Sequence, residues 1–147
     1  MATQYALSVK QPWATLLVHG LKTIEVRRWP TARRGRILLH AARVPDERPE
    51  AWARVPPELR EMAQLLGGII GAGDLIDCRI YRCVEAFQVD QPCHLNDPSW
   101  FQPPLLYGFA FANLTYLPFR RYSGWMRFFS VSDENDQASR EHERPEG

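Results

Sequence analysis

The sequence predicts an α+β fold in which five or six strands curl into a small barrel, with one helix after the first strand and further helices between the third and fourth strands. Three observations predict this class. Short stretches with strand character recur along the chain, a proline-initiated helix pattern follows the first of them, and a helix-like spacing of apolar residues occupies the middle. The strands are expected at residues 5–9, 22–29, 35–42, 69–78 with a second segment to 87, 107–116 and 127–132.

The first helix is expected at residues 12–19. Pro12 suits the first helical position, because the N–H that proline lacks has no partner there. Trp13, Leu16 and Leu17 share one face at i, i+3 and i+4, which predicts packing on a core. Gly20 supplies a left-handed stop.

The strand at 22–29 is expected to divide its side chains between two faces. Ile24 and Val26 point to one side, and Glu25 and Arg27 point to the other. The carboxylate and the guanidinium are therefore expected to be neighbours.

The middle and the end of the chain are expected to be less regular. Residues 46–66 predict a short helix, a break at a proline pair, and then a longer helix. Residues 89–104 contain four prolines and predict a long surface loop. Residues 133–147 carry six acids and two arginines, with no aliphatic side chain larger than alanine, and are expected to be a disordered tail. One folded domain is therefore expected at 1–132.

Composition limits the class of protein. A chain of 147 residues with 45% apolar residues is sufficient for one core. No apolar run approaches the roughly 18 residues of a membrane span, and the N-terminus does not resemble a signal peptide. The three cysteines are odd in number, and Cys93 and His94 have no second pair at zinc-like spacing. We expect a cytoplasmic monomer with reduced thiols and without a metal or cofactor.

Charge is distributed unevenly along the sequence. Residues 1–43 hold eight lysines and arginines and one acid, whereas residues 44–147 hold ten against sixteen acids. A basic segment of this kind favours an anionic partner, of which nucleic acid is the commonest. The alternative is that acids from the second part fold beside these arginines and cancel their field.

The two lysines stand out among sixteen arginines. Lys10 and Lys22 both lie in the basic segment. Lysine is a compact phosphate contact, and it loses its proton when desolvated more readily than arginine does. Both are therefore candidate site residues, unless they are simply solvated.

Several motifs resemble the activating signal cointegrator homology (ASCH) domain. The strongest are the runs at 8–14, 20–29 and 34–41, which contain Ser-Val-Lys-Gln-Pro-Trp-Ala, Gly-Leu-Lys-Thr-Ile-Glu-Val-Arg-Arg-Trp and Arg-Gly-Arg-Ile-Leu-Leu-His-Ala in order. Segments 68–78, 107–109 and 122–125 are similar to the remaining strands of the family. The resemblance covers roughly residues 4–132.

The resemblance implies a barrel like that of pseudouridine synthase and archaeosine transglycosylase (PUA) domains, with the first helix beside an open cleft. It also implies a partner in that cleft: RNA, single-stranded nucleic acid or a modified nucleoside. The predicted binding residues are Lys10, Gln11, Trp13, Lys22, Glu25, Arg27, Trp29, Arg34, Arg121, Ser123 and Gly124.

The chemistry of these side chains leaves alternatives open. The arginines suit phosphate contacts or base stacking. Glu25 either accepts a hydrogen bond from an exocyclic amine of a base or pairs with Arg27. Trp13 and Trp29 suit base stacking, although core packing is favoured for Trp13. His40 is expected to be a hydrogen-bonded core histidine.

A small hydrolase is the alternative function. Some ASCH-like proteins resemble amidohydrolases of N4-acylated cytidine, with a lysine and a threonine three residues later. Here Glu25 stands three residues after Lys22, which breaks that pattern. Other relatives resemble single-strand ribonucleases, for which Lys22, Glu25 and Ser123 would be the catalytic residues.

Overall fold

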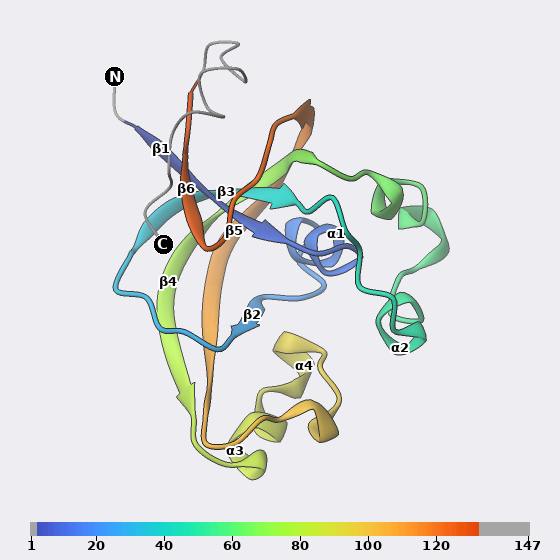
Figure 1. Ribbon diagram of the computed structural model, residues 1–147. Helices are drawn as coiled ribbons and strands as arrows, with labels where there is room; N and C mark the ends of the chain where they lie inside the picture. Colours follow the sequence, from blue (N-terminus) through green and yellow to red (C-terminus); the bar gives the residue numbers. More distant parts are fainter. Residues whose placement is uncertain (1–2, 133–147) are drawn as a thin grey trace.

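The computed structural model describes residues 3–132. Six strands form one sheet that curls on itself (Figure 1), in the order β2-β5-β4-β3-β1-β6. The strands are β1 (Gln4–Val9), β2 (Ile24–Arg27), β3 (Gly35–Ala41), β4 (Gly68–Tyr81), β5 (Leu106–Arg121) and β6 (Phe128–Val131). The predicted α+β fold is confirmed. The segment 133–147, expected to be a disordered tail, lies outside the described residues.

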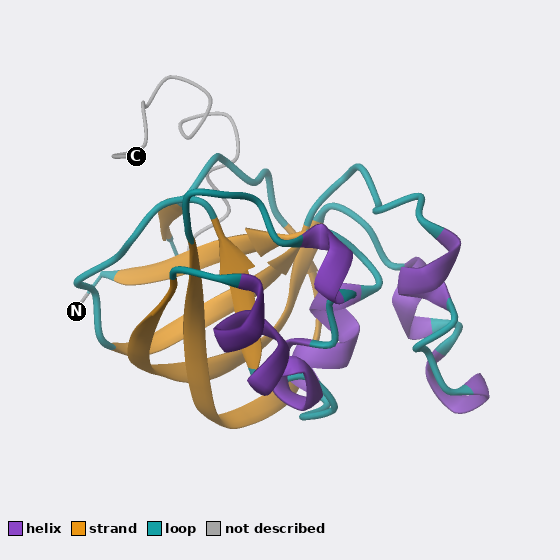
Figure 2. Cartoon of the chain, turned by 90° about the horizontal axis from the view of Figure 1, so that it is seen from below, coloured by secondary structure: helices purple, strands orange, loops and turns teal. Residues whose placement is uncertain are grey.

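The helices are short and lie mainly to one side of the strands (Figure 2). They are α1 (Trp13–Val18), α2 (Pro49–Trp52), α3 (Val84–Val89) and α4 (Gln91–His94), with 3-10 helices at Pro57–Leu59, Met62–Gln64 and Pro98–Trp100. β1 and β3 pair in parallel and every other neighbouring pair is antiparallel. α1 lies in the connection between β1 and β3, because parallel strands need a crossover. Within residues 3–132 no helix has the length and apolar character needed to cross a membrane.

The core lies between α1 and the concave side of the sheet. Every residue of α1 is buried, and Leu16 and Leu17 pack with side chains such as Leu39 and Phe109. A Cβ at Gly71 would lie 2.4 Å from Cγ1 of Val18 and 2.5 Å from a backbone oxygen of β5. α1 therefore contacts the backbone of β4 directly, which fixes the helix against the sheet.

The longer helix predicted before residue 66 is wrong. The chain forms α2 and then two 3-10 helices, Pro57–Leu59 and Met62–Gln64. Of these six residues only Ala63 is buried. A continuous α-helix would gain little here, because its apolar side chains would not share one buried face.

The strand predicted to continue to residue 87 is also wrong. β4 ends at Tyr81 and residues 84–89 form α3. Phe87 is fully buried and contacts the ring of Tyr81. The short apolar run at 84–87 fits a buried helix as well as a strand, and periodicity alone does not separate them.

Residues 89–104 are not only a surface loop. They contain α4 and the 3-10 helix Pro98–Trp100, and His94 is completely buried. The His94 ring stacks on Phe87 at 4.1 Å, and its Nε2 lies 2.7 Å from the Phe87 carbonyl oxygen. Pro92 and Pro98 occupy the first turns of their helices, where proline is compatible with helical structure.

Candidate functional site

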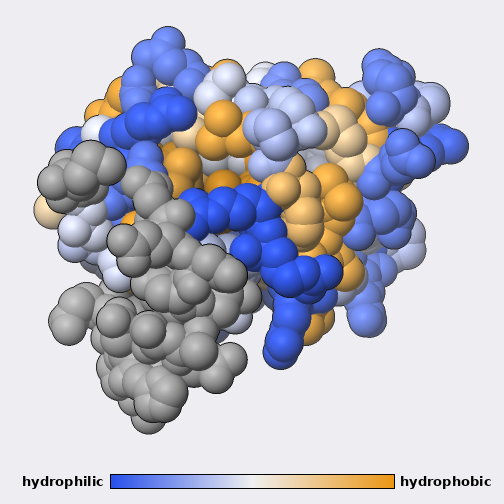
Figure 3. All heavy atoms as spheres, turned by 90° about the horizontal axis from the view of Figure 1, so that it is seen from above, coloured by the Kyte–Doolittle hydropathy of each residue, from blue (hydrophilic) through white to orange (hydrophobic). Residues whose placement is uncertain are grey.

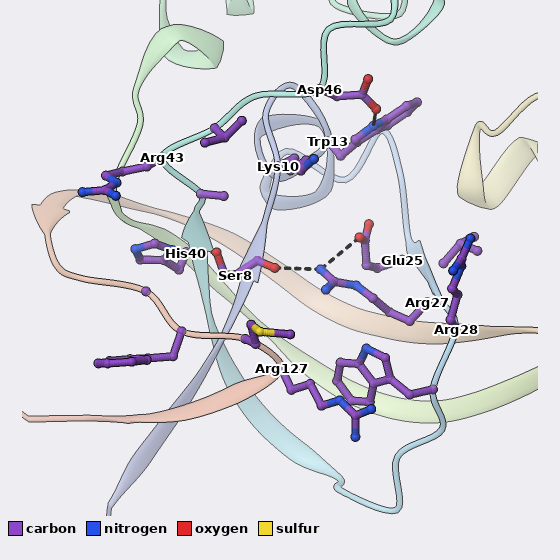
Figure 4. A pocket seen from close by; sticks show the side chains of 18 of the residues that line it. Ser8, Lys10, Trp13, Glu25, Arg27, Arg28, His40, Arg43, Asp46 and Arg127 are labelled. Carbon is purple, nitrogen blue, oxygen red and sulfur yellow. Dashed lines mark hydrogen bonds and ion pairs between the residues drawn. The ribbon is translucent and has the colours of Figure 1, made fainter. Parts of the chain in front are cut away.

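A cavity of about 1200 Å³ opens between the N-terminal end of α1, strand β2, the segment after β3 and the loop that follows β5. Figure 4 shows side chains from these elements converging on it, with Glu25 and Arg27 on one side and Ser8 and His40 on another. The residues come from six separate parts of the sequence. The fold therefore assembles this site from distant segments.

Lys22 is completely buried at the base of the cavity. Its side chain is 1% exposed, and Nζ donates a hydrogen bond of 2.8 Å to the carbonyl oxygen of His94. The same nitrogen lies 3.5 Å from Oε1 of Glu25 and 4.8 Å from the centre of the Trp13 ring. The ammonium is thus enclosed by a carbonyl, a carboxylate and an aromatic face.

Burial lowers the pKa of Lys22, because desolvation penalises its charged form. The Coulombic attraction and hydrogen bond of Glu25 act in the opposite direction, and the charge of Arg27 lowers the pKa further. Glu25 therefore favours the charged form of the lysine, against the effect of burial.

Glu25 joins Lys22 to Arg27. Its Oε2 lies 3.1 Å from Nη2 of Arg27, and the same Nη2 donates to the carbonyl oxygen of Ser8 at 2.7 Å (Figure 4). The expected proximity of Glu25 and Arg27 is present. Arg27 Nε is buried without a hydrogen-bond partner. The carboxylate is shared between two cations, and Arg27 links β2 to β1 through the Ser8 carbonyl.

Asp46 organises a second group of side chains. Oδ2 accepts from Trp13 Nε1 at 2.8 Å (Figure 4) and from Arg48 Nη2 at 2.6 Å. Oδ1 accepts from the backbone N–H of Arg48 at 2.9 Å, and the Asp46 carbonyl accepts from Trp52. The Arg48 guanidinium lies 3.6 Å above the Trp100 ring. Trp13 and Trp100 meet edge to face at 6.2 Å.

These contacts stabilise the charged form of Asp46. Burial by itself raises the pKa of this carboxyl, but the hydrogen bonds from Arg48 and Trp13 outweigh burial and hold the pKa at about 2. Asp46 is therefore ionised at neutral pH.

His40 supports the loop that follows β5. It is buried, with Nε2 2.7 Å from the Tyr122 carbonyl oxygen and Nδ1 3.1 Å from Ser8 Oγ. A carbonyl oxygen only accepts, so Nε2 carries the proton and donates. A Cβ at Gly124 would lie 2.4 Å from His40 Cε1, and glycine therefore lets this loop rest on the ring. These contacts agree with the expected hydrogen-bonded core histidine.

The rim of the cavity is cationic, with two exposed apolar side chains. Val44 and Met126 are 60% and 82% exposed. Figure 3 shows this mixture on one face of the molecule, where hydrophobic surface lies in a hollow and hydrophilic side chains lie beside it. The exposed cations that line the cavity are Lys10, Arg28, Arg43, Arg48, Arg121 and Arg127.

Most of the predicted binding residues meet at this cavity. Those that line it are Lys10, Trp13, Lys22, Glu25, Arg27, Trp29, Arg121, Ser123 and Gly124. Trp13 also belongs to the core, as expected, and Trp29 packs edge-on against Phe109 and Phe128.

Two predicted residues do not line the cavity. Gln11 is fully buried; its Oε1 accepts from the backbone N–H of Thr15 and its Nε2 donates to the Leu65 carbonyl, both at 3.0 Å. Arg34 is exposed and donates to carbonyls within its own turn. Gln11 holds α1 to the segment before β4, and Arg34 lies in the turn before β3.

Sequence reasoning missed other residues of the cavity. Asp46, Arg48 and Trp100 lie in segments expected to be helix or surface loop, and Arg43 and Arg127 flank predicted strands. The only local signal was the i, i+2 spacing of Asp46 and Arg48, which is equally common among solvated residues. Within residues 3–132 no group of three or more His, Cys, Asp or Glu side chains is arranged to hold a metal ion.

The different burial of the two lysines predicts different reactivity. An amine-acylating reagent should modify exposed Lys10 in the native protein and leave Lys22 protected more than about 100-fold, because reaction requires local opening. Mass spectrometry of peptides taken during the reaction measures both rates. Addition of urea should make the two rates similar; similar rates in native buffer would contradict the burial of Lys22.

Comparisons with known proteins place the chain in a family. The chain is 38% identical over 87 residues to human activating signal cointegrator 1 and 37% identical to the mouse protein. Each match covers 50% of this chain but 14% of the relative, so the similarity concerns one part of a much longer protein.

Solved structures extend the comparison to nearly the whole chain. The crystal structure of ASCH from Zymomonas mobilis aligns with a TM-score of 0.62 over 95% of this chain and 94% of that chain, at 15% identity. Two single-substitution variants of that protein align with the same TM-score. At this identity the likeness concerns the fold. The model of the ASCH domain matches residues 7–132. The chain belongs to the ASCH domain family.

Proposed function

We propose that this chain binds RNA or single-stranded nucleic acid in the cavity described above. The observation that carries the proposal is the charge of the cavity lining. Eight cationic side chains line the cavity together with only two carboxylates, Glu25 and Asp46. Each carboxylate is already ion-paired with an arginine of the site. A site with this excess of positive charge attracts a polyanion.

The alternative that acids of the second part of the chain cancel the basic segment has little support at the cavity. Asp46 is the single acid that residues 44–132 contribute to the lining. That same part adds Arg48, Arg121 and Arg127. At the cavity, residues 44–132 thus add three cations and one acid to the positive charge of the first 43 residues.

The size and surface of the cavity favour a strand over a single nucleoside. Pockets for small molecules usually measure about 300–1,000 Å³, and this cavity is larger, at about 1200 Å³. Its lining includes the rings of Trp13, Trp29 and Trp100 beside the cations. Single-strand sites combine such aromatic faces with a cationic path for the backbone. Membership of the ASCH family, which suggests interaction with nucleic acid in general, supports the same proposal.

Salt dependence of binding tests the proposal. A fluorescent single strand should bind about 50-fold more weakly at 200 mM than at 50 mM salt if roughly four phosphates are neutralised, since each contributes about −0.7 to the logarithmic slope. Arg121→Ala should lower that slope by about 0.7, because Arg121 is exposed on the rim. Arg82→Ala is the matched control, since Arg82 is exposed and outside the cavity. Fluorescence anisotropy titrations measure the affinities and the salt slopes of the wild type and of both variants. Absence of binding at 50 mM salt would contradict the proposal.

The hydrolase alternative gains no comparable support. Lys22 donates to the His94 carbonyl and lies beside Glu25, and its side chain is 1% exposed. A general acid must reach the atom that it protonates, and a buried, ion-paired ammonium has little access to a ligand. Gel analysis of the strand after each titration provides the check: loss of full-length strand that Lys22→Met abolishes would restore the alternative.

A further inference from the structure

We propose that Arg48 is a stacking platform for one nucleobase of the bound strand. This inference rests on the proposed function, and it assigns a role to a residue outside the predicted binding set. Arg48 lies just before α2 and lines the cavity with Trp100 and Asp46. Protein contacts already occupy several parts of its guanidinium group.

One face of the guanidinium is covered. Cζ of Arg48 lies 3.6 Å from the centre of the Trp100 ring, and the Trp100 ring meets Trp13 edge to face. Trp100 is held by the 3-10 helix Pro98–Trp100, whose first turn is capped by Asp97 through the backbone N–H of Ser99 at 2.9 Å. The two planar groups therefore form a short, supported stack.

The Nε–Nη2 edge, one of the two edges through which arginine binds a phosphate, is also occupied. Nε of Arg48 donates to both carboxylate oxygens of Asp46 at 3.1 and 3.2 Å, and Nη2 donates to Oδ2 at 2.6 Å. Arginine usually recognises phosphate through two parallel hydrogen bonds from such an edge. Asp46 is ionised, so the pair is nearly neutral and attracts a phosphate only weakly.

What remains available within residues 3–132 is the second face, together with Nη1. The Arg48 side chain is still 47% exposed although Trp100 covers one face and Asp46 one edge. A planar, weakly hydrated cation stacks well on a nucleobase. Asp46 holds the guanidinium in place before the ligand arrives, so little conformational freedom is lost on binding. The geometry therefore suits a base better than a phosphate.

Arg48→Lys distinguishes these two roles. Lysine keeps the charge and an ion pair with Asp46 but has no planar face. In the wild type, an abasic nucleotide moved stepwise along a short strand should weaken binding about tenfold at one position, by loss of one stacked base. In Arg48→Lys, affinity for the intact strand should fall by the same factor, and the abasic nucleotide at that position should have no further effect. The salt slope should stay unchanged.

The controls separate failure of this inference from failure of the proposed function. Arg82→Lys should bind like the wild type at every abasic position, since Arg82 lies outside the cavity. Urea unfolding should show that Arg48→Lys is folded under the binding conditions. Unchanged affinity of Arg48→Lys, or a continued tenfold effect of the abasic nucleotide in that variant, would overturn the stacking role of Arg48 but not the proposed function. No binding by the wild type would overturn both proposals.

Discussion

Lys22→Met is expected to lower the free energy of unfolding by about 3 kcal/mol, because it breaks a buried charge pair from one side. Methionine keeps the length of the stem but not the ammonium group. The His94 carbonyl, which accepts from Nζ at 2.8 Å, would lose that donor, and Glu25 would keep only Arg27 as an ionic partner. A buried acceptor without a partner costs about 1–3 kcal/mol, and the carboxylate adds to this cost. Urea unfolding at neutral pH measures the loss.

Lys10→Met is the matched control, since these two are the only lysines of the chain. Lys10 is exposed on the cavity rim, so its replacement should change stability by less than about 0.5 kcal/mol. The two variants should therefore separate the functions of the two lysines. Lys10→Met should weaken strand binding with a shallower salt slope, and Lys22→Met should mainly destabilise the protein. Equal stability of the two variants would contradict a structural role for Lys22.

A double-mutant cycle with Glu25→Gln tests whether the two buried groups act together. Lys22 and Glu25 are in contact, so their substitutions should not be additive, and a coupling energy of about 1–3 kcal/mol is expected. The cycle is informative because Arg27 remains in place as the second partner of Glu25 in every variant.

The sequence predicted the parts of the fold that follow from local periodicity. The strand at 5–9, the helix after it and the left-handed stop at Gly20, with φ of 77°, agree with the structure. Pro12 is the N-cap of α1, which begins one residue later than predicted, at Trp13. The end of β5 was missed because the segment after residue 116 contains Pro118. This proline lies between the paired positions Gly71–Tyr116 and Ile69–Arg120, where the register shifts. A proline is tolerated at such an irregularity, since it is not required to donate to the ladder.

The candidate site was predictable only where its residues lie in the N-terminal motifs. Lys22, Glu25 and Arg27 were identified there, but the burial of Lys22 depends on His94, which is 72 positions away along the chain. Asp46 and Arg48 form an i, i+2 pair that is common on solvated surfaces. Their role becomes visible only when Trp13 and Trp100 are brought to the same carboxylate and guanidinium. Local patterns contain no information on such contacts.

Asp46→Asn should destabilise the protein by about 2 kcal/mol at pH 7, and the difference from the wild type should disappear in acid. The pKa of Asp46 is held at about 2 in the folded protein, compared with 3.8 for an unperturbed aspartate. A carboxyl whose folded pKa is depressed contributes stability above its unfolded pKa and loses it as the pH falls through the folded value. A difference of nearly two pKa units corresponds to about 2 kcal/mol.

Asp46→Asn also places an amide NH₂ group, which is itself a donor, among three hydrogen-bond donors of the protein. Trp13 Nε1, Arg48 Nη2 and the backbone N–H of Arg48 all donate to the carboxylate, and an asparagine NH₂ group accepts from none of them. Urea unfolding should therefore show a constant difference in the free energy of unfolding between wild type and Asp46→Asn from pH 7 to pH 5. The gap should narrow between pH 4 and pH 2. A difference that persists below pH 2 would show that packing, and not the charge of Asp46, stabilises this side of the cavity.

The binding assay adds a second readout for Asp46→Asn. Arg48 without its anionic partner is free to leave Trp100. An abasic nucleotide at the position assigned to Arg48 should then no longer weaken binding.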